Sequence, residues 1–271
     1  MVYKVIDLYD YYKIDRGGAN GGYLTVYSRT ESAELKKRVR TAMLVIPGGG
    51  YNMISDREGE PVALKFLDSG FVSFVLTYSV KTKYPTPLKE AMLAMEYIRN
   101  NAERYGIGKV CAAGFSAGGH LAGLLATVKA DEAALIGKTS DKIKPDAVIL
   151  SYPVATMGGY THSDTRRNIT GGEAALYDKL SVEKRVDGET SPAFIWHTFE
   201  DNCVPVENSL MLASAYREAG VPCAVHIFEH GWHGLSLADG ETCDFTQEQN
   251  HLHKVGKWFD LSLDWLRSRG F

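Results

Sequence analysis

The sequence predicts an α/β fold with an eight-stranded, mostly parallel sheet and helices on both of its faces. Short apolar runs of strand length alternate along the chain with longer segments whose apolar residues recur at helical spacing. The runs are continuously apolar, as is typical of parallel strands that are covered on both faces. The 271 residues contain no internal repeat and no low-complexity tract, so we expect a single domain over residues 1–271.

The predicted strands are apolar runs bounded by turn-forming residues. The first two flank the turn-rich residues 16–22 and are expected to pair antiparallel. The later strands are separated by helix-length segments, which indicates parallel pairing. The strands are expected over residues 2–8, 23–27, 42–46, 71–78, 110–115, 147–152, 193–198 and 224–228.

The predicted helices lie between these strands. The longest begins at Pro87, where the missing N–H of proline does no harm because the first turn has no intrahelical acceptor for it. The apolar residues that follow it keep helical spacing. The helices are expected over residues 60–67, 87 to about 104, 117–128, 206–219 and about 252–267.

One segment is too long to be a simple connection. Residues 155–189 are rich in glycine, threonine and charged residues and follow a predicted strand. Insertions of this length usually form a lid, a binding loop or a flexible excursion. We therefore expect a cap or loop insertion here, within the same domain, that contains a short helix over residues 173–180.

Composition excludes several classes of partner. A net charge of −3 and a pI near 6.2 give no reason to expect a nucleic acid or an anionic membrane. No apolar stretch approaches the length of a membrane span, and the first residues lack the pattern of a signal peptide. The expected compartment is the cytoplasm, although a chain from which a leader had been removed would look the same. The oligomeric state, including a homo-oligomer, stays open.

The four cysteines are scattered, with no CxxC motif and no metal-ligand spacing. A cytoplasmic chain of this size is expected to keep them reduced. No metal site and no cofactor are expected.

The strongest functional signal is the motif Gly-Phe-Ser-Ala-Gly at residues 114–118, which fits G-x-S-x-G. The motif closes a predicted strand and opens a predicted helix. Such a reversal requires small residues two before and two after the serine, because larger side chains would collide. A helix start with an unimportant serine is the alternative, and its probability falls once the motif must lie between a strand and a helix. Ser116 is therefore the predicted nucleophile.

A serine hydroxyl needs a base to take its proton and an acid to orient that base. Asp201 follows the strand at 193–198, and His233 follows the strand at 224–228. Both lie at carboxyl ends of parallel strands, the edge at which Ser116 also emerges and ligands bind. Two neighbours compete: Glu200 for the acid and His230 for the base. We favour Asp201, which leads into the next helix, and His233, which lies in a Gly-x-His-Gly loop.

The third requirement is a set of N–H donors for the negative charge that develops on the ester oxygen. The N–H of Ala117, directly after the serine, is one predicted donor. The run Pro-Gly-Gly-Gly after the strand at 42–46 lets the backbone approach a substrate closely. Gly49 and Gly50 are the predicted donors there, with Gly48 as a further candidate. A plain glycine turn is the alternative, but it explains three glycines less well than one or two.

These stretches together resemble the α/β-hydrolase superfamily, in particular its carbohydrate-esterase and acetylesterase branch, which includes acetyl xylan and feruloyl esterases. The resemblance extends over roughly residues 41–237. It implies the α/β-hydrolase fold, a triad of Ser116, Asp201 and His233, and the removal of acetyl, or sometimes feruloyl, groups from sugars. The motifs that carry it are PGGGY, GFSAGGHLAG, WHTFEDNCVPVENSL and GVPCAVHIFEHGWHGLSL.

Two departures concern the substrate. Pro47 stands where lipase-like esterases carry histidine, which is usual in the sugar-esterase branch, and Ser79 stands where many relatives carry arginine. Aromatic faces suit sugar rings, so Tyr51, Tyr152 and Trp232 are candidate substrate contacts.

The predicted function is hydrolysis of short-chain acyl esters, above all acetyl esters on small-molecule sugar substrates. A peptidase or a short-chain lipase of the same fold, or a noncatalytic binding protein on an esterase scaffold, are the alternatives. Cys203, two residues past Asp201, is expected to be a small apolar filler more than a border of the site.

Overall fold

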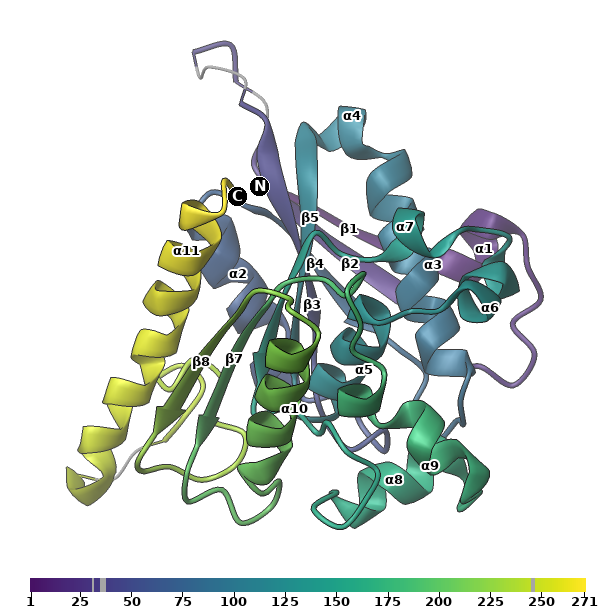
Figure 1. Ribbon diagram of the computed structural model, residues 1–271. Helices are drawn as coiled ribbons and strands as arrows, with labels where there is room; N and C mark the ends of the chain where they lie inside the picture. Colours follow the sequence, from purple (N-terminus) through teal and green to yellow (C-terminus); the bar gives the residue numbers. More distant parts are fainter. Residues whose placement is uncertain (31, 35–37, 245–246) are drawn as a thin grey trace.

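The computed structural model describes residues 1–30, 32–34, 38–244 and 247–271. Its centre is one eight-stranded sheet with the order β1-β2-β4-β3-β5-β6-β7-β8 (Figure 1). β2 is antiparallel to both of its neighbours, and all the other pairs are parallel. The predicted sheet is confirmed. The strands are β1 (Val2–Asp7), β2 (Tyr23–Ser28), β3 (Arg40–Ile46), β4 (Val72–Thr77), β5 (Ile107–Phe115), β6 (Ala147–Ser151), β7 (Ala193–Thr198) and β8 (Cys223–Phe228).

Helices pack on both faces of this sheet and enclose two apolar cores. One face carries α2 (Glu60–Asp68) and α11 (Trp258–Ser268). Phe66 of α2 and Trp258 of α11 pack with the side chains of the central strands that point to this face. The other face carries α3 (Thr86–Asn100), α5 (Ala117–Ala126) and α10 (Glu207–Glu218). Figure 1 shows the two groups on either side of the strands. Because both faces are covered, the central strands are mostly apolar, as the sequence indicates.

Two predicted helices are shorter than expected. The long helix ends at Asn100, and α4 (Ala102–Tyr105) follows as a separate turn. Asn101 separates them, and its side-chain amide donates to the Tyr97 carbonyl at 2.8 Å, a local hydrogen bond that competes with helix continuation. At the other end of the chain, a 3₁₀ segment (Gln247–Lys257) precedes α11. The structure also adds short helices that the sequence did not predict, namely α1 (Leu8–Tyr12), α6 (Ala130–Ala133) and α7 (Ser140–Ile143).

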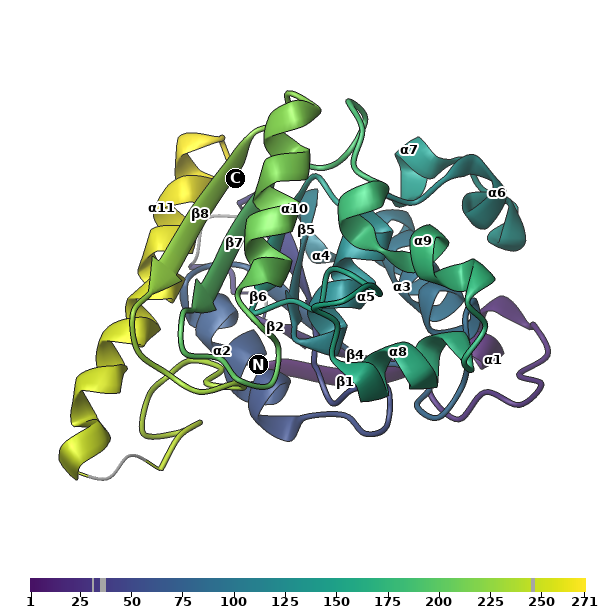
Figure 2. The ribbon, with the colours of Figure 1, turned by 60° about the horizontal axis from the view of Figure 1, so that its bottom comes forward.

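The insertion at 155–189 contains two helices, one of them unexpected. α9 (Ala175–Leu180) agrees with the short helix predicted over residues 173–180. α8 (Ser163–Thr170) is new, and the His162 side chain caps it by accepting a hydrogen bond from the Thr165 N–H. Figures 1 and 2 show α8 and α9 together at the end of the sheet to which the arrows of β7 and β8 point. The insertion therefore lies at the edge where the predicted site residues emerge.

Among the residues that the structure describes, no helix combines the length and the apolar character that crossing a bilayer requires. The cytoplasmic location stays a prediction. All four cysteines carry free thiols.

Candidate active site

Ser116 occupies the sharp reversal between β5 and α5. Its backbone has φ 53° and ψ −119°, a conformation that residues with a side chain rarely adopt. The predicted crowding around it is present. A Cβ on Gly118 would lie 2.1 Å from the Ile46 carbonyl oxygen, and one on Gly114 would lie 2.3 Å from the Gly118 carbonyl oxygen. Only glycine fits at either position, so the strand, the turn and the helix together hold the serine at the tip.

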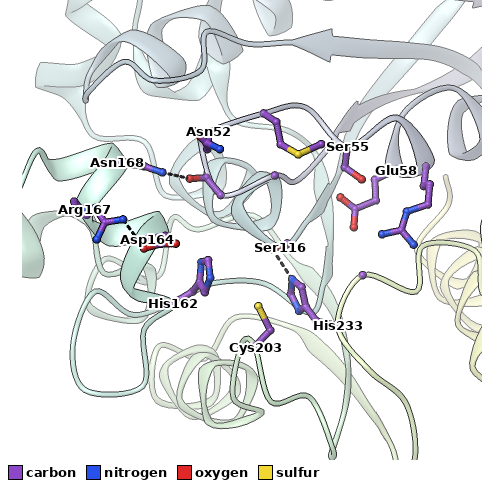
Figure 3. A pocket seen from close by; sticks show the side chains of 15 residues that line it. Asn52, Ser55, Glu58, Ser116, His162, Asp164, Arg167, Asn168, Cys203 and His233 are labelled. Carbon is purple, nitrogen blue, oxygen red and sulfur yellow. Dashed lines mark hydrogen bonds and ion pairs between the residues drawn. The ribbon is translucent and has the colours of Figure 1, made fainter.

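The structure brings the predicted base and acid to this serine. His233 Nε2 lies 2.7 Å from Ser116 Oγ, and His233 Nδ1 lies 2.7 Å from Asp201 Oδ2 (Figure 3 shows the first contact). Because a carboxylate only accepts, Nδ1 carries the proton, and Nε2 is left to accept from the serine hydroxyl. This arrangement can transfer a proton from the serine to the imidazole.

Asp201 is held from several sides. Its side chain is fully buried, and its Oδ1 accepts hydrogen bonds from the N–H groups of Cys203 and Val204, each at 2.9 Å. His197 Nε2 lies 3.3 Å from Oδ2 on a second side. Burial alone would raise the pKa of Asp201, but hydrogen bonds from His197 and His233 outweigh it and hold that pKa well below its ordinary value. The carboxylate is therefore ionised and fixed in orientation at neutral pH.

The two competing candidates lie away from the serine. Glu200 Oε1 and His230 Nδ1 are 2.9 Å apart, and their side chains are about half exposed. Glu200 also accepts from the Gly231 N–H at 3.3 Å, so the pair ties the loop after β7 to the loop after β8. Neither residue lines the pocket around Ser116.

The loop of residues 47–51, called here the oxyanion loop, lies next to the serine: a Cβ on Gly48 would be 2.9 Å from Ser116 Cβ. The Gly48 N–H donates to Glu58 Oε2 at 2.8 Å, which makes Gly48 unsuitable as a donor to substrate. Outside regular elements, none of the backbone hydrogen bonds found among the described residues has Gly49, Gly50 or Ala117 as its donor. These three N–H groups are available to a ligand.

A cavity of about 470 Å³ opens above the serine. Figure 3 shows side chains of α8 on one side of it, Glu58 and Ser55 on the opposite side, and Cys203 below His233. Ten of the fifteen lining residues carry polar or charged side chains, which can form hydrogen bonds with a ligand that has several hydroxyl groups. The residues that line it are Gly49, Gly50, Asn52, Met53, Ser55, Arg57, Glu58, Ser116, His162, Asp164, Arg167, Asn168, Cys203, His233 and Gly234.

The structure corrects two of the three predicted aromatic contacts. Tyr51 and Tyr152 are buried in the core and do not line the cavity. Their hydroxyl groups have protein partners instead: Tyr51 pairs with His120 Nδ1 at 2.8 Å, and Tyr152 donates to Glu58 Oε1 at 2.7 Å. Burial raises the pKa of both phenols, so they stay neutral. Trp232 is 38% exposed beside His233 but is absent from the lining, and its substrate contact stays a prediction.

Several lining residues were missed from the sequence. Glu58 is 3% exposed and bridges Gly48 to Tyr152. Asn168 lies on α8 and His162 caps its first turn, and α8 has too few apolar residues to be recognised from the sequence. Cys203, expected to be a filler, is exposed and lines the cavity. No sequence signal marks these residues, because each reaches the site through the folding of a loop or an insertion.

Within the described ranges, no group of three or more histidine, cysteine, aspartate or glutamate side chains could hold a metal ion. The groups around Ser116 have the geometry that acyl transfer requires of a nucleophile, a base, an acid and N–H donors.

Comparisons with known proteins identify the family of the chain. The BD-FAE family matches residues 30–216. The chain is 44% identical over 214 residues to endo-1,4-beta-xylanase B of Butyrivibrio fibrisolvens, a match that covers 74% of this chain and 33% of that protein. It is 30% identical over 228 residues to the acetylxylan esterase of Xylanibacter ruminicola, covering 80% of this chain and 45% of that protein. The chain thus spans less than half the length of these two relatives.

Among solved structures, the acetyl ester-xyloside bifunctional hydrolase from Caldicellulosiruptor lactoaceticus superposes with a TM-score of 0.81 at 32% identity. The match covers 99% of this chain and 97% of that one. The resemblance seen in the sequence motifs therefore extends to the whole described sheet. The chain belongs to the BD-FAE family and has the α/β-hydrolase fold.

Proposed function

We propose that the chain is a serine esterase that removes short acyl groups, above all acetyl groups, from sugars such as xylo-oligosaccharides. The observation that carries the proposal is a pair of 2.7 Å contacts. One joins the Ser116 hydroxyl to the His233 imidazole, and the other joins this imidazole to the buried Asp201 carboxylate. Three available N–H groups beside the serine support it further.

In the acylation step, Ser116 Oγ attacks the ester carbonyl carbon, and its proton passes to His233 Nε2. The imidazolium that forms is stabilised by the Asp201 carboxylate. The carbonyl oxygen becomes negatively charged and is held by the N–H groups of Ala117, Gly49 and Gly50, each of which can contribute about 3–4 kcal/mol. The C–O bond to the sugar then breaks, and His233 gives its proton to the departing alcohol oxygen.

In the deacylation step, a water molecule takes the place of the sugar. His233 accepts one proton from this water as the oxygen attacks the acyl-serine carbonyl carbon. The same N–H groups hold the second oxyanion. When the bond to Ser116 breaks, the proton on His233 returns to the serine oxygen and the carboxylic acid is released. No metal or organic cofactor takes part in the proposed steps.

The choice of substrate is supported by the cavity and by the relatives. Hydrogen-bonding side chains surround the serine on opposite sides, and Figure 3 shows His162, Asp164 and Asn168 on the α8 side. Sugar hydroxyl groups can pair with such side chains, whereas a long fatty acyl chain cannot. Two relatives are described as an acetylxylan esterase and an acetyl ester-xyloside hydrolase.

The test compares 4-nitrophenyl acetate, butyrate and decanoate with acetylated xylo-oligosaccharides, using the wild type and Ser116→Ala. We expect acetate to be hydrolysed fastest among the 4-nitrophenyl esters, and Ser116→Ala to lower kcat about 10⁶-fold. A fluorophosphonate probe should label the wild type at Ser116 and leave the variant unlabelled. A preference for decanoate would refute the short-acyl specificity, and an unlabelled, inactive wild type would instead indicate a binding protein.

A further inference from the structure

The oxyanion loop has an unusual backbone that cannot persist by itself. Gly49, Gly50 and Tyr51 all have positive φ, at 118°, 64° and 57°. For tyrosine this conformation costs free energy, because its Cβ crowds the backbone. A strained segment of this kind keeps its shape only where its surroundings hold it in place. The contacts that hold this loop are therefore part of what keeps its N–H groups beside Ser116.

Each of the five carbonyl groups of the loop accepts a hydrogen bond. Four of the five carbonyl groups accept from residues that follow the loop within about 30 positions along the chain, whereas the Gly50 carbonyl accepts from the insertion at 155–189. The donors are the Tyr78 hydroxyl to Pro47 O (2.9 Å), the Ser55 N–H to Gly48 O (3.1 Å), the Asn52 and Met53 N–H groups to Gly49 O (3.0 and 3.1 Å), the Asn168 side-chain amide to Gly50 O (2.8 Å) and the Lys81 N–H to Tyr51 O (2.7 Å).

A hydrogen bond to the carbonyl group of one residue also fixes the orientation of the N–H group of the next residue, here Tyr51. In a trans peptide unit the C=O and the following N–H point in opposite directions, and the peptide bonds of this loop are all trans. The amide of Asn168 therefore sets the plane of the peptide unit that joins Gly50 to Tyr51. Gly49 and Gly50 line the cavity with free N–H groups. The Gly50 N–H belongs to the preceding peptide unit, which is joined to this one at the Gly50 Cα, so a rotation of one unit displaces the other.

The insertion reaches the loop at a second point. The Tyr51 hydroxyl lies 2.8 Å from His120 Nδ1, and His120 Nε2 lies 2.7 Å from the carbonyl oxygen of Leu180, the last residue of α9. Because that carbonyl only accepts, Nε2 carries the proton and Nδ1 accepts from the tyrosine. Burial lowers the pKa of His120 to about 4, so the ring is neutral. Both ends of the Gly50–Tyr51 unit are thus tied to the insertion.

We propose that Asn168 is a positioning residue for the oxyanion site: the insertion holds the Gly50–Tyr51 peptide through its amide, and so keeps the free N–H groups of the loop at the reacting carbonyl. Asn168 acts through the loop and touches no reacting atom. The insertion is then a part of the catalytic machinery as well as a wall of the cavity. This inference rests on the proposed esterase function.

The test uses two substitutions, Asn168→Ala and Asn168→Asp, with 4-nitrophenyl acetate as substrate. Alanine removes the donor, and aspartate replaces it by oxygens that repel the Gly50 carbonyl. Removing one oxyanion donor costs about 10²–10³ in kcat. Because these variants misplace donors without deleting them, we expect kcat to fall about 10- to 100-fold, more in the aspartate variant, with KM within about twofold. The matched control is Asn101→Ala, which removes the 2.8 Å amide-to-carbonyl bond to Tyr97 far from the site.

A transition-state analogue gives an independent readout. A trifluoromethyl ketone adds to Ser116 Oγ: the serine proton passes to His233 and the ketone oxygen becomes an oxyanion. Its affinity should weaken in both Asn168 variants by about the factor lost in kcat/KM, and stay unchanged in Asn101→Ala.

Four results would overturn the inference. One is kcat within twofold of the wild type in both Asn168 variants. Another is a rise in KM at constant kcat, which would make Asn168 a ground-state substrate contact. A third is a loss of kcat that matches the unfolded fraction at the assay temperature, which would make its role general stability. If instead the wild type hydrolyses no ester and takes no fluorophosphonate, the esterase function fails and this inference fails with it.

Discussion

Two glycine-rich turns meet at the site, and they are held in different ways. The turn at 114–118 presents Ser116 and is fixed by the strand and helix that it joins, because Gly114 and Gly118 pack directly on neighbouring backbone. The oxyanion loop at 47–51 presents N–H groups and depends on side chains from elsewhere, including Glu58, Asn168 and His120.

This difference separates two kinds of failure. Damage to the turn at 114–118 disturbs the packing of α5 on β3 and therefore the fold. Damage to an anchor of the oxyanion loop leaves the sheet intact but lets a strained segment relax. The first should appear as lost stability together with lost activity, and the second as lost activity at nearly constant stability.

Gly118→Val should have the largest effect. Its Cβ would lie 2.1 Å from the Ile46 carbonyl oxygen and 2.3 Å from the Pro47 carbonyl oxygen, so backbone must move apart. We expect about 3 kcal/mol of destabilisation and loss of measurable esterase activity. Thermal unfolding and 4-nitrophenyl acetate hydrolysis measure both. Gly188→Ala is the control, because a Cβ there meets nothing within 4 Å. A Gly118→Val protein with wild-type Tm and activity would show that the fold does not require the close approach of Gly118 to the Ile46 and Pro47 carbonyl groups.

Glu58→Gln should have an intermediate effect, confined to the loop. The carboxylate accepts from the Gly48 N–H and from the Tyr152 hydroxyl, whereas an amide can accept on only one of its two sides. One buried donor then loses its partner, at a cost of about 1–3 kcal/mol. We expect kcat to fall about tenfold as the loop shifts. Glu103→Gln, on the exposed side of α4, is the matched control. Unchanged kcat would mean that the loop keeps its shape without this anchor.

His120→Asn should have the smallest effect on activity at neutral pH, a few-fold loss of kcat. It should also change how the free energy of unfolding depends on pH. Burial lowers the pKa of His120 to about 4, below the ordinary value of about 6.5. Between these values the unfolded chain binds a proton that the folded chain does not, so His120 makes the free energy of unfolding rise with pH across pH 4–6.5. The wild-type-minus-variant difference in that free energy should increase over this window and be constant above it. Urea unfolding at several pH values measures it, and a difference independent of pH would contradict the burial argument.

The same contrast explains what could be predicted from the sequence. The serine turn depends on residues that are neighbours in the chain, and the acid and base follow directly after strands, so a reading of motifs and strand ends places Ser116, Asp201 and His233. The anchors of the oxyanion loop come from positions up to 118 residues away. Asn168 lies on α8, whose sequence SDTRRNIT buries only Thr165, Ile169 and Thr170. That pattern has no apolar periodicity to reveal a helix.

The tyrosines that were predicted to contact substrate show a second limit of prediction from the sequence. Tyr51 and Tyr152 follow motif residues and carry a polar tip, which suits a cleft and a core equally well. Their position is decided by buried partners, His120 and Glu58, that are distant in sequence. Only the folded arrangement shows that these hydroxyl groups are already satisfied inside the protein.

The positive φ of Ser116 has a consequence for the stability of the fold. Glycine adopts that conformation without strain, so replacing the serine by glycine would relieve the backbone and favour the folded state. The Ser116 side chain therefore stands at a position where the backbone alone would be more stable with glycine, and the proposed function accounts for a hydroxyl there.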